Sequence, residues 1–389
     1  MSRESVDPVA AARDLLPAQC ARADEIERLR HLPRDLSDKL AAAGLYRLWA
    51  PVECGGLELP PRPVLETFET LATADASTAW CVFIAVTSAT ALARIPPATA
   101  RSVFATPTTV LAGAFAQRGT AVATGATGGG WRVDGQWQWG SNIHNADWVL
   151  GGCRLMRDGE PERLPNGAPR TAMVLVPAAD VELLDTWHVA GLCGTGSTDF
   201  AMHGVVVPDD RLVDLQTKPQ AAGALYAFPQ FTLLAMGIAA VALGLGRAAI
   251  DELIALAASK TPAGGSRPLA QRPAAQADVA RAEASLRSGR AFFHEAVASA
   301  WASAGAGGHV PLAARRDVRL ATTHAVGAAV RAVDMCYDLG GGTSVYRRSP
   351  LQRIFRDVHT LTQHVMVGPA TLELTGRLLF GLETDTTML

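Results

Sequence analysis

The hydrophobic pattern of this 389-residue chain changes its period twice. The resulting order of helical, strand-like and again helical regions is the sequence feature that constrains the fold most strongly. From Val6 to about Phe104, apolar and charged residues alternate near the 3.6-residue period of helices. From about Thr109 to Asp214, short apolar segments are separated by Gly, Pro and Asp turns, which is typical of strands. From about Gln220 onward the chain is helical again and rich in alanine. We therefore expect an α+β protein with an N-terminal helical domain (1–108), a middle β domain (109–215) and a C-terminal helical domain (216–389).

Several breaks can be placed within this order. Asp134-Gly135 lies between two alternating runs and is a signal for a tight hairpin turn. The segment Lys260–Pro273 contains several prolines and glycines and cannot be helical throughout. Leu339–Ser344 carries three consecutive glycines and predicts a second break in the C-terminal helices.

Two uncharged stretches, 76–93 and 221–246, are long enough to span a bilayer. Both are dominated by small residues, and neither has the basic flank that sets orientation in a membrane. We expect buried helices of a soluble bundle, because a helix that is apolar all round is buried.

Charge and cysteine content exclude other classes of function. The formal net charge is −2, without a long run of either sign, so nucleic acid is not an expected partner. The six cysteines are scattered, without metal-ligand spacing, so we expect no metal site and no disulfide framework. These thiols fit a reducing cytoplasm.

Three segments carry the motifs that point to chemistry. The first is 135–142 (GQWQWGSN), followed by 146–149 (ADWV); the second is 191–199 (GLCGTGSTD); the third is 351–357 (LQRIFRD). Together, and in this order, they resemble the acyl-CoA dehydrogenase superfamily over nearly the whole chain. The resemblance implies that family's fold, with a β-barrel or sandwich in the middle domain and a C-terminal four-helix bundle.

The resemblance also implies a flavin site in the first segment. Trp139 falls on the family tryptophan, Ser141 on the hydroxyl residue beside the isoalloxazine, and Asn142 on the family asparagine. A flavin needs an aromatic wall, hydrogen-bond donors and a covering that excludes water. Trp137 and Trp139 are two residues apart, so on a strand they are expected to share one face. The alternative is that this pair only fills the core between sheet and helices.

Further cofactor-binding residues follow from the same resemblance. Thr195 and Ser197 belong to the second segment. Gly341 and Gly342 resemble the glycine pair that approaches the flavin of a neighbouring subunit, although a glycine triplet is also a common hinge. Arg267 lies where the dehydrogenases carry a pyrophosphate-binding motif that is absent here, so it is either a substitute cation or a solvated loop arginine.

The departures from the family pattern bear on the reaction. An acyl-CoA dehydrogenase needs a glutamate to remove the proton next to the thioester, and that position falls on Val365. Some members place the glutamate on the helix that corresponds to 231–250, and here that stretch contains no carboxylate. Dehydrogenation of acyl-CoA is therefore disfavoured.

A histidine lies next to the position where the dehydrogenases carry their catalytic glutamate. His364 precedes the glutamate position, and a histidine in this place is similar to the flavin-dependent monooxygenases that share the fold. With an ordinary pKa of about 6.5, it could donate or accept a proton near neutral pH. The alternatives are a core histidine that is bonded to a carbonyl, and His359, which on a helix would point about 140° away.

We place Trp80, Thr87 and His188 at the substrate pocket. Thr87 lies where many of these monooxygenases carry a substrate-side histidine, and His188 stands just before the second motif. A structural histidine is the alternative for His188.

The resemblance thus implies the oxygenase component of a flavin-dependent monooxygenase. Reduced flavin (FADH2 or FMNH2) would come from a separate NAD(P)H-dependent reductase, because the chain has no nicotinamide-binding fingerprint. With molecular oxygen, a C4a-hydroperoxyflavin would oxidise a small organic substrate at carbon, nitrogen or sulfur. The family's assembly implies a homotetramer. The alternatives are a divergent acyl-CoA dehydrogenase or oxidase, and a scaffold that has lost its chemistry.

Overall fold

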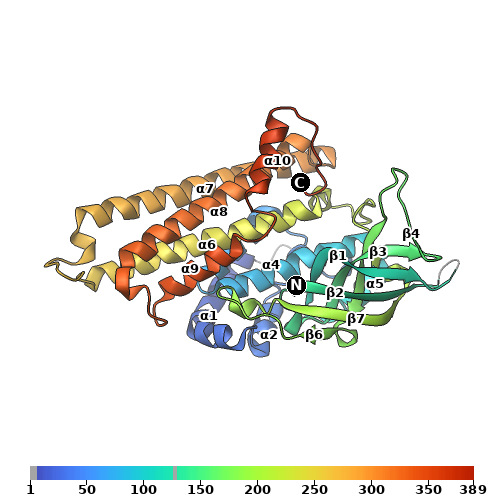
Figure 1. Cartoon of the computed structure of the whole chain (residues 1–389), viewed down its shortest axis with the longest axis horizontal. Coiled ribbons are helices and arrows are strands. Elements are labelled where there is room, and N and C mark those ends of the chain that lie inside the picture. The colour runs from blue at the N-terminus through green and yellow to red at the C-terminus, as the bar shows by residue number, and fades with distance from the viewer. Residues whose placement is uncertain (1–6, 126–128) are drawn as a thin grey trace.

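The structure is a computed structural model that describes residues 7–125 and 129–389, without the side chains of residues 306 and 307. The order helices, sheet, helices agrees with the α+β prediction (Figure 1). All strands lie between Leu111 and Val213, inside the predicted middle domain. The domain boundaries stay a prediction, and residues 1–6, which open the first of these domains, lie outside the described residues.

Five helices form the N-terminal part. Asp75 caps α4 by accepting a hydrogen bond from the Thr78 backbone N–H at 2.7 Å. All fourteen residues of α4 are buried, which explains why its sequence is apolar all round. The helices are α1 (Pro8–Leu29), α2 (Arg34–Ala42), α3 (Pro61–Ala72), α4 (Ala76–Ala89) and α5 (Pro97–Val103).

The middle part is one mixed sheet with the strand order β6-β7-β2-β1-β3-β5-β8, and β4 pairs with β3. Apolar residues from β1, β2, β3, β5 and β7 gather in one cluster, so the sheet curls around its own inner face. The strands are β1 (Leu111–Ala123), β2 (Trp131–Gly140), β3 (Trp148–Arg157), β4 (Glu160–Pro161), β5 (Thr171–Pro177), β6 (Glu182–Leu184), β7 (Thr198–Val207) and β8 (Leu212–Val213).

The hairpin predicted at Asp134-Gly135 is wrong, because both residues lie inside β2. A Cβ on Gly135 would lie 2.6 Å from the Gly119 Cα, so glycine here permits close packing between strands. Asp134 Oδ1 accepts a hydrogen bond from the Gly204 N–H at 2.8 Å on the neighbouring strand. The dipeptide therefore marks an irregularity in the pairing of β2 with β7, where the register shifts between Val133 and Gly135.

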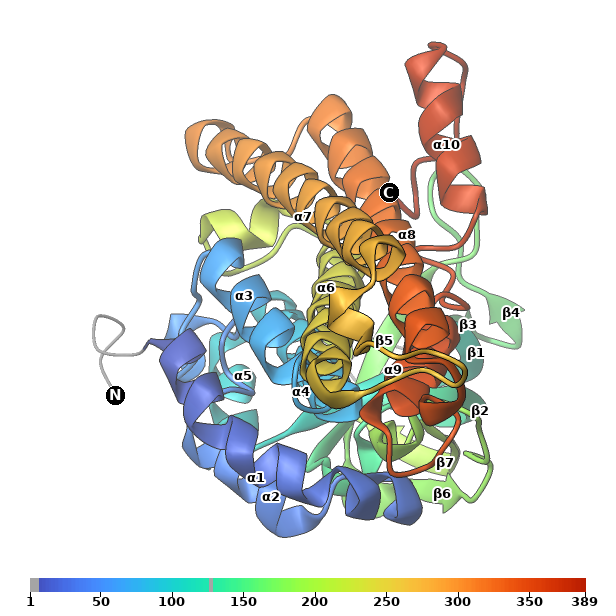
Figure 2. The ribbon, with the colours of Figure 1, turned by 90° about the vertical axis from the view of Figure 1, so that its left-hand side faces the viewer.

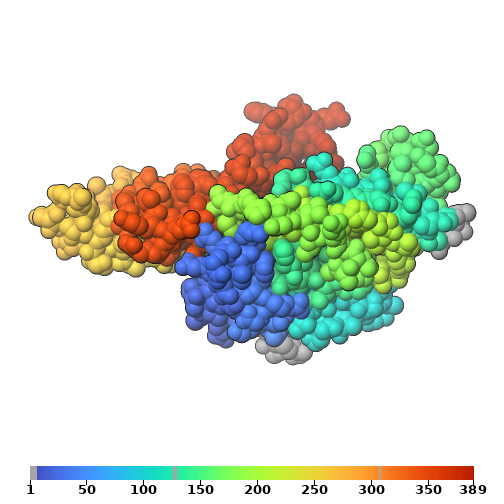
Figure 3. All heavy atoms as spheres, turned by 60° about the horizontal axis from the view of Figure 1, so that its bottom comes forward, coloured from blue at the N-terminus to red at the C-terminus, as the bar shows by residue number. Residues whose placement is uncertain are grey.

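Long helices form the C-terminal part, and both predicted breaks separate them. The helices α6, α7, α8 and α9 pack as a bundle, and the far end of α7 and α8 extends beyond the rest of the molecule (Figures 1 and 3). The helices are α6 (Gln230–Ser259), α7 (Pro273–Gly307), α8 (Leu312–Gly340), α9 (Pro350–Leu361) and α10 (Ala370–Leu379).

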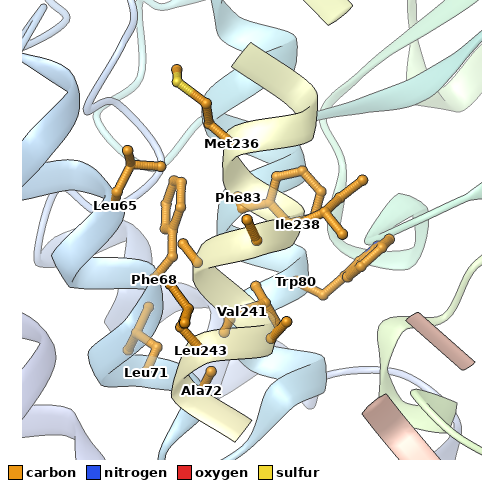
Figure 4. Packing of buried hydrophobic residues seen from close by; sticks show 14 of the residues in the cluster. Leu65, Phe68, Leu71, Ala72, Trp80, Phe83, Met236, Ile238, Val241 and Leu243 are labelled. Carbon is orange, nitrogen blue, oxygen red and sulfur yellow. The ribbon is translucent and has the colours of Figure 1, made fainter. Parts of the chain in front are cut away.

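The N-terminal and C-terminal helices share one hydrophobic core. Figure 2 shows α6 between α3 and α4 on one side and α7 and α8 on the other. Phe68 of α3, Phe83 of α4 and Ile238 of α6 interdigitate there, and Trp80 lies at the margin of the labelled cluster away from Leu65 (Figure 4). Helix α4 is thus fixed between the core and the sheet.

Two helical segments, Ala76–Arg94 and Gln230–Ser259, are long and apolar enough to cross a membrane. Their most apolar windows are 100% and 94% buried inside the protein, as expected of core helices.

Candidate active site

A chain of hydroxyl groups links the end of β2 to the start of β7. The Ser141 and Ser197 Oγ atoms are 2.7 Å apart, and Ser197 Oγ is 2.6 Å from Thr195 Oγ1. Trp80 of α4 donates its Nε1–H to Ser141 Oγ at 3.1 Å. All four side chains are buried. Three of the predicted cofactor or catalytic residues and one predicted pocket residue therefore meet in one network.

The donor and the acceptor in each of these hydrogen bonds follow from the bond that Thr195 makes. Thr195 Oγ1 donates to the Leu192 carbonyl at 2.8 Å, so Thr195 accepts from Ser197, and Ser197 accepts from Ser141. Ser141 in turn accepts from Trp80. Each hydroxyl has a defined donor and acceptor, so the group that the flavin edge would meet is already oriented.

The turn that carries Thr195 is anchored by α9. Asp357 is buried, and its Oδ1 accepts a hydrogen bond from the Leu192 N–H at 2.6 Å. Arg356 donates to the Ala190 carbonyl, and a Cβ on Gly191 would overlap the Arg356 carbonyl. Burial raises the pKa of Asp357 to about 7. The third sequence motif thus supports the second, a role that its resemblance alone did not identify.

Trp139 stands at the exposed side of this network. The expectation that Trp137 and Trp139 share one face is wrong: Trp137 is fully buried and stacks on Phe200, whereas Trp139 is 66% exposed. The cause is local backbone geometry, because Trp139 has φ 66° and the pairing of β2 with β7 shifts between Trp137 and Gly140. The alternative that the pair fills the core therefore applies to Trp137 and not to Trp139.

Asn142 offers an unused donor. Its backbone is left-handed, with φ 61°, and its N–H donates to the Thr195 carbonyl at 2.8 Å. Its side-chain Nδ2 is buried and has no hydrogen-bond partner within the described part of the chain. A buried amide without an acceptor is costly unless a ligand supplies one.

His364 approaches the network from the segment after α9. Its ring meets Trp80 edge to face, with the centroids 5.9 Å apart. His364 Nδ1 accepts a hydrogen bond from the Met366 backbone N–H at 3.2 Å, so the neutral ring carries its proton on Nε2. Burial, followed by the nearby positive charge of Arg319, lowers the pKa of His364 to about 4. The ring is therefore neutral, and a hydrogen-bond donor, around neutral pH.

His359 has a different environment. Its Nε2 lies 2.9 Å from Asp334 Oδ1 on α8, and its side chain is 40% exposed. The two candidate histidines thus face different groups, and His364 is the one that contacts Trp80.

The other two residues predicted for the pocket lie outside this cluster. Thr87 is fully buried on α4 and donates its hydroxyl to the Phe83 carbonyl at 2.9 Å. His188 is exposed, 3.6 Å from Asp185, and borders Arg30. Their place in a substrate pocket stays a prediction.

Arg267, Gly341 and Gly342 lie at the far end of the bundle. Arg267 is exposed in the loop between α6 and α7, where it lines a hollow of about 580 Å³ with Arg272 and Leu339. Lys260 donates to the Gly340 carbonyl beside the two glycines. This end of the bundle is remote from the sheet (Figure 1), so these residues do not meet Ser141 within one chain.

Comparison with known proteins identifies the family. The sequence matches the C-terminal domain of acyl-CoA dehydrogenases over residues 236–369 and their N-terminal domain over residues 3–103. An indole-3-acetate monooxygenase of Pseudomonas putida is 34% identical over 93% of this chain and 90% of its own length. The chain belongs to the acyl-CoA dehydrogenase superfamily.

Solved structures and further relatives assign a branch of this superfamily. A 3-HSA hydroxylase from a Rhodococcus species has a TM-score of 0.90 and 26% identity, with 100% of both chains covered. XiaF from Streptomyces, in complex with FADH2 and glycerol, has a TM-score of 0.90 and 27% identity over 98% of this chain and 97% of its own. Within the acyl-CoA dehydrogenase superfamily, this chain is an oxygenase component of a flavin-dependent monooxygenase, with a separate reductase as the source of reduced flavin. The predicted family, fold, enzyme class and flavin cofactor are confirmed.

The residues present fit a flavin. The buried Asn142 Nδ2 lacks an acceptor that a flavin ring would supply, and the exposed Trp139 offers an aromatic surface two residues from Ser141. The position of the dehydrogenase glutamate is occupied by Val365, which is 65% exposed. Members of the acyl-CoA dehydrogenase superfamily that oxidise thioesters need a base there, and this chain has none at that position.

Proposed function

We propose that this oxygenase component acts on an aromatic small molecule beside the Trp80–His364 pair. Trp80, which donates to Ser141, contacts two further aromatic rings: its ring centroid lies 4.8 Å from that of Phe83 and 5.9 Å from that of His364. Aromatic walls of this kind favour a planar, apolar substrate. Two relatives are named for aromatic compounds, an indole-3-acetate monooxygenase and a resorcinol hydroxylase. The Trp80–His364 contact is the observation that carries this proposal.

Trp139, Asn142, Thr195 and Ser197 would hold the flavin, with Ser141 at its reacting edge. Bound reduced flavin and oxygen supply one oxygen atom to the substrate, while the second oxygen atom leaves as water and the flavin is oxidised. Ser141 Oγ, which accepts from Trp80 and donates to Ser197, would place its oriented hydroxyl oxygen at this edge. His364, neutral and protonated on Nε2, would donate a hydrogen bond from the substrate side through that N–H.

Turnover with chemically matched substrates tests this proposal. The protein, a flavin reductase and NADH are supplied with indole-3-acetate, resorcinol, or an aliphatic sulfide and amine of similar size. We expect oxygenated product from an aromatic compound, and hydrogen peroxide alone from the aliphatic ones. Efficient oxygenation of an aliphatic sulfide or amine, with none of an aromatic compound, would contradict the aromatic assignment.

We further propose a homotetramer in which Gly341, Gly342 and Arg267 approach a neighbour's flavin. The exposed side of α10 and its end carries Leu372, Leu379 and Phe380, and Phe380 is 84% exposed, so an apolar surface is available for another copy. The six free cysteines fit a soluble protein of the reducing cytoplasm.

Gly342 gives a sharp test of this assembly. Apart from its two chain neighbours, no described residue lies within 4 Å of a Cβ added to Gly342, so Gly342→Ala costs little within one chain unless a neighbour or its flavin is close. We expect a tetramer in light scattering and weaker flavin binding in Gly342→Ala. A monomer of about 41 kDa that binds flavin equally well in both forms would contradict the proposal.

A further inference from the structure

Arg319 of α8 is a buried cation that joins three distant segments. It is 2% exposed. Its Nη1 donates to the Met366 carbonyl at 3.2 Å and contacts Met366 Sδ at 3.3 Å. Its Nη2 donates to the Phe231 carbonyl at 3.3 Å and to the Met388 carbonyl at 2.7 Å. One guanidinium therefore ties the start of α6, the segment after α9 and the final residues to α8.

This arrangement is electrostatically expensive. Within the described ranges, no carboxylate lies within ion-pair distance of Arg319, and all its bonded acceptors are neutral. Burial, with repulsion from Arg315 one turn away, lowers the pKa of Arg319 to about 10. An apolar residue in its place would leave the Met366, Phe231 and Met388 carbonyls without this donor.

Arg319 also contacts Met366, the residue whose backbone N–H donates the hydrogen bond that orients His364. The Met366 residue accepts from Arg319 through its carbonyl and donates to His364 Nδ1 through its N–H. Arg319 therefore restrains, through its carbonyl and its sulfur, the residue whose N–H selects the tautomer of His364. Arg319 is also the charged group whose field reaches the His364 ring, and α4 presents only the uncharged Trp80 to it.

We propose that Arg319 is a positioning residue that holds Met366 and thereby keeps the ring of His364 oriented, with its proton on Nε2, facing the reaction site. The proposal rests on the role of His364 in the proposed function. The final residues share in this clamp, because the Thr386 and Met388 carbonyls are held by Arg315 and Arg319, and the Leu389 side chain is fully buried.

Hydrogen–deuterium exchange of the Met366 amide in the flavin-free protein reports on the hydrogen bond from the Met366 N–H to His364 Nδ1. We expect Arg319→Met to speed that exchange about tenfold, the factor that corresponds to about 1.4 kcal/mol and to one lost net hydrogen bond. Arg316→Met is the matched control, because Arg316 is a neighbour on α8 whose guanidinium pairs with Asp317 at 2.8 Å. It removes the same charge from the helix without touching Met366, and should leave the exchange unchanged.

The pH profile of coupling separates positioning from a merely structural role. In the parent protein His364 stays neutral, so the ratio of product to hydrogen peroxide should be flat from about pH 5.5 to 8. Loss of the Arg319 charge removes the smaller of the two causes that lower the pKa of His364, while burial, the larger cause, stays, so in Arg319→Met that ratio should fall only at the acid end of this range. Arg319→Lys keeps the positive charge but loses the planar guanidinium that donates to several carbonyls at once. It should therefore restore the flat pH profile but only part of the coupling of oxygen use to product formation. Arg319→Lys also serves if the Met variant does not fold.

Two outcomes would overturn the proposal. One is unchanged Met366 exchange in Arg319→Met and Arg319→Lys; the other is an equal acceleration in Arg316→Met. His364→Ala separates this failure from that of the proposed function: full coupling in that variant would remove His364 from the chemistry, whereas the exchange data decide whether Arg319 holds Met366.

Discussion

Replacing Ser141 with alanine should reveal how α4 and the sheet are joined at the active site. The Ser141 hydroxyl accepts the Trp80 Nε1–H at 3.1 Å, and both side chains are buried. Alanine leaves that indole N–H without a partner, and a buried unsatisfied donor costs about 1–3 kcal/mol of the free energy of unfolding. Ser197 loses the hydrogen bond that it accepts from Ser141 but keeps Thr195 as a partner, so the indole N–H is the donor that is left unsatisfied. We therefore expect Ser141→Ala to lower Tm by a few degrees and to weaken coupling of oxygen to product.

A double-mutant cycle isolates the contact. In a Trp80→Phe background there is no indole N–H to strand, so Ser141→Ala should cost about 1 kcal/mol less than in the parent. Tm and product yield are measured at one protein concentration, because self-association adds to apparent stability. If alanine at position 141 cost the same in both backgrounds, the Trp80–Ser141 bond would not be the link between helix and sheet, and the reasoning would be refuted.

Three further predictions follow from the geometry. His364→Asn should bind reduced flavin but release mainly hydrogen peroxide, whereas His359→Ala, whose imidazole lies beside a carboxylate of α8, should keep most product formation; equal losses in both would remove the distinction. Burial raises the pKa of Asp357 to about 7 from 3.8, so the contribution of this carboxyl group to stability is lost as the pH rises through about 7. Asp357→Asn should therefore reduce the change of Tm with pH between about pH 4 and 8. An unchanged pH dependence of Tm would contradict the raised pKa of Asp357. Gly191→Ala should lose flavin affinity in a binding titration, since its Cβ overlaps a carbonyl of α9, while Gly305→Ala on α7, which meets open space, should bind as the parent does.

Periodicity and composition predicted the elements because burial imposes them. The uncharged segments of α4 and α6 are apolar on every side, and both are core helices. The breaks at Lys260–Pro273 and after Leu339 follow from glycine and proline, and α6, α7 and α8 end or begin there. Each of these features depends on residues close together in the sequence.

Local patterns failed where long-range packing decides the geometry. Asp134-Gly135 has the composition of a turn, but the glycine is needed for contact with β1 and the aspartate bonds to β7. Trp139 was expected on the same face as Trp137, but the left-handed backbone of Trp139 itself turns its side chain outward. A sequence pattern cannot show either effect, since both depend on the neighbouring strands.

The candidate site shows the same division. Ser141 and Ser197 were found from their motifs, and the structure brings them within hydrogen-bond distance. Asp357 and Arg319 act through backbone groups that are far away in the sequence, so residue type and spacing gave no signal of their roles.

Isotopic labelling of the transferred oxygen tests the central claim most directly. The protein is supplied with a flavin reductase, NADH, indole-3-acetate as the probe and ¹⁸O2, and the product is analysed by mass spectrometry. As an oxygenase component that uses reduced flavin, the chain should place one ¹⁸O atom in each product molecule, and omission of the reductase should abolish product. Product without label, or a protein that ignores free reduced flavin but holds oxidised FAD and bleaches it with an acyl-CoA, would contradict the account.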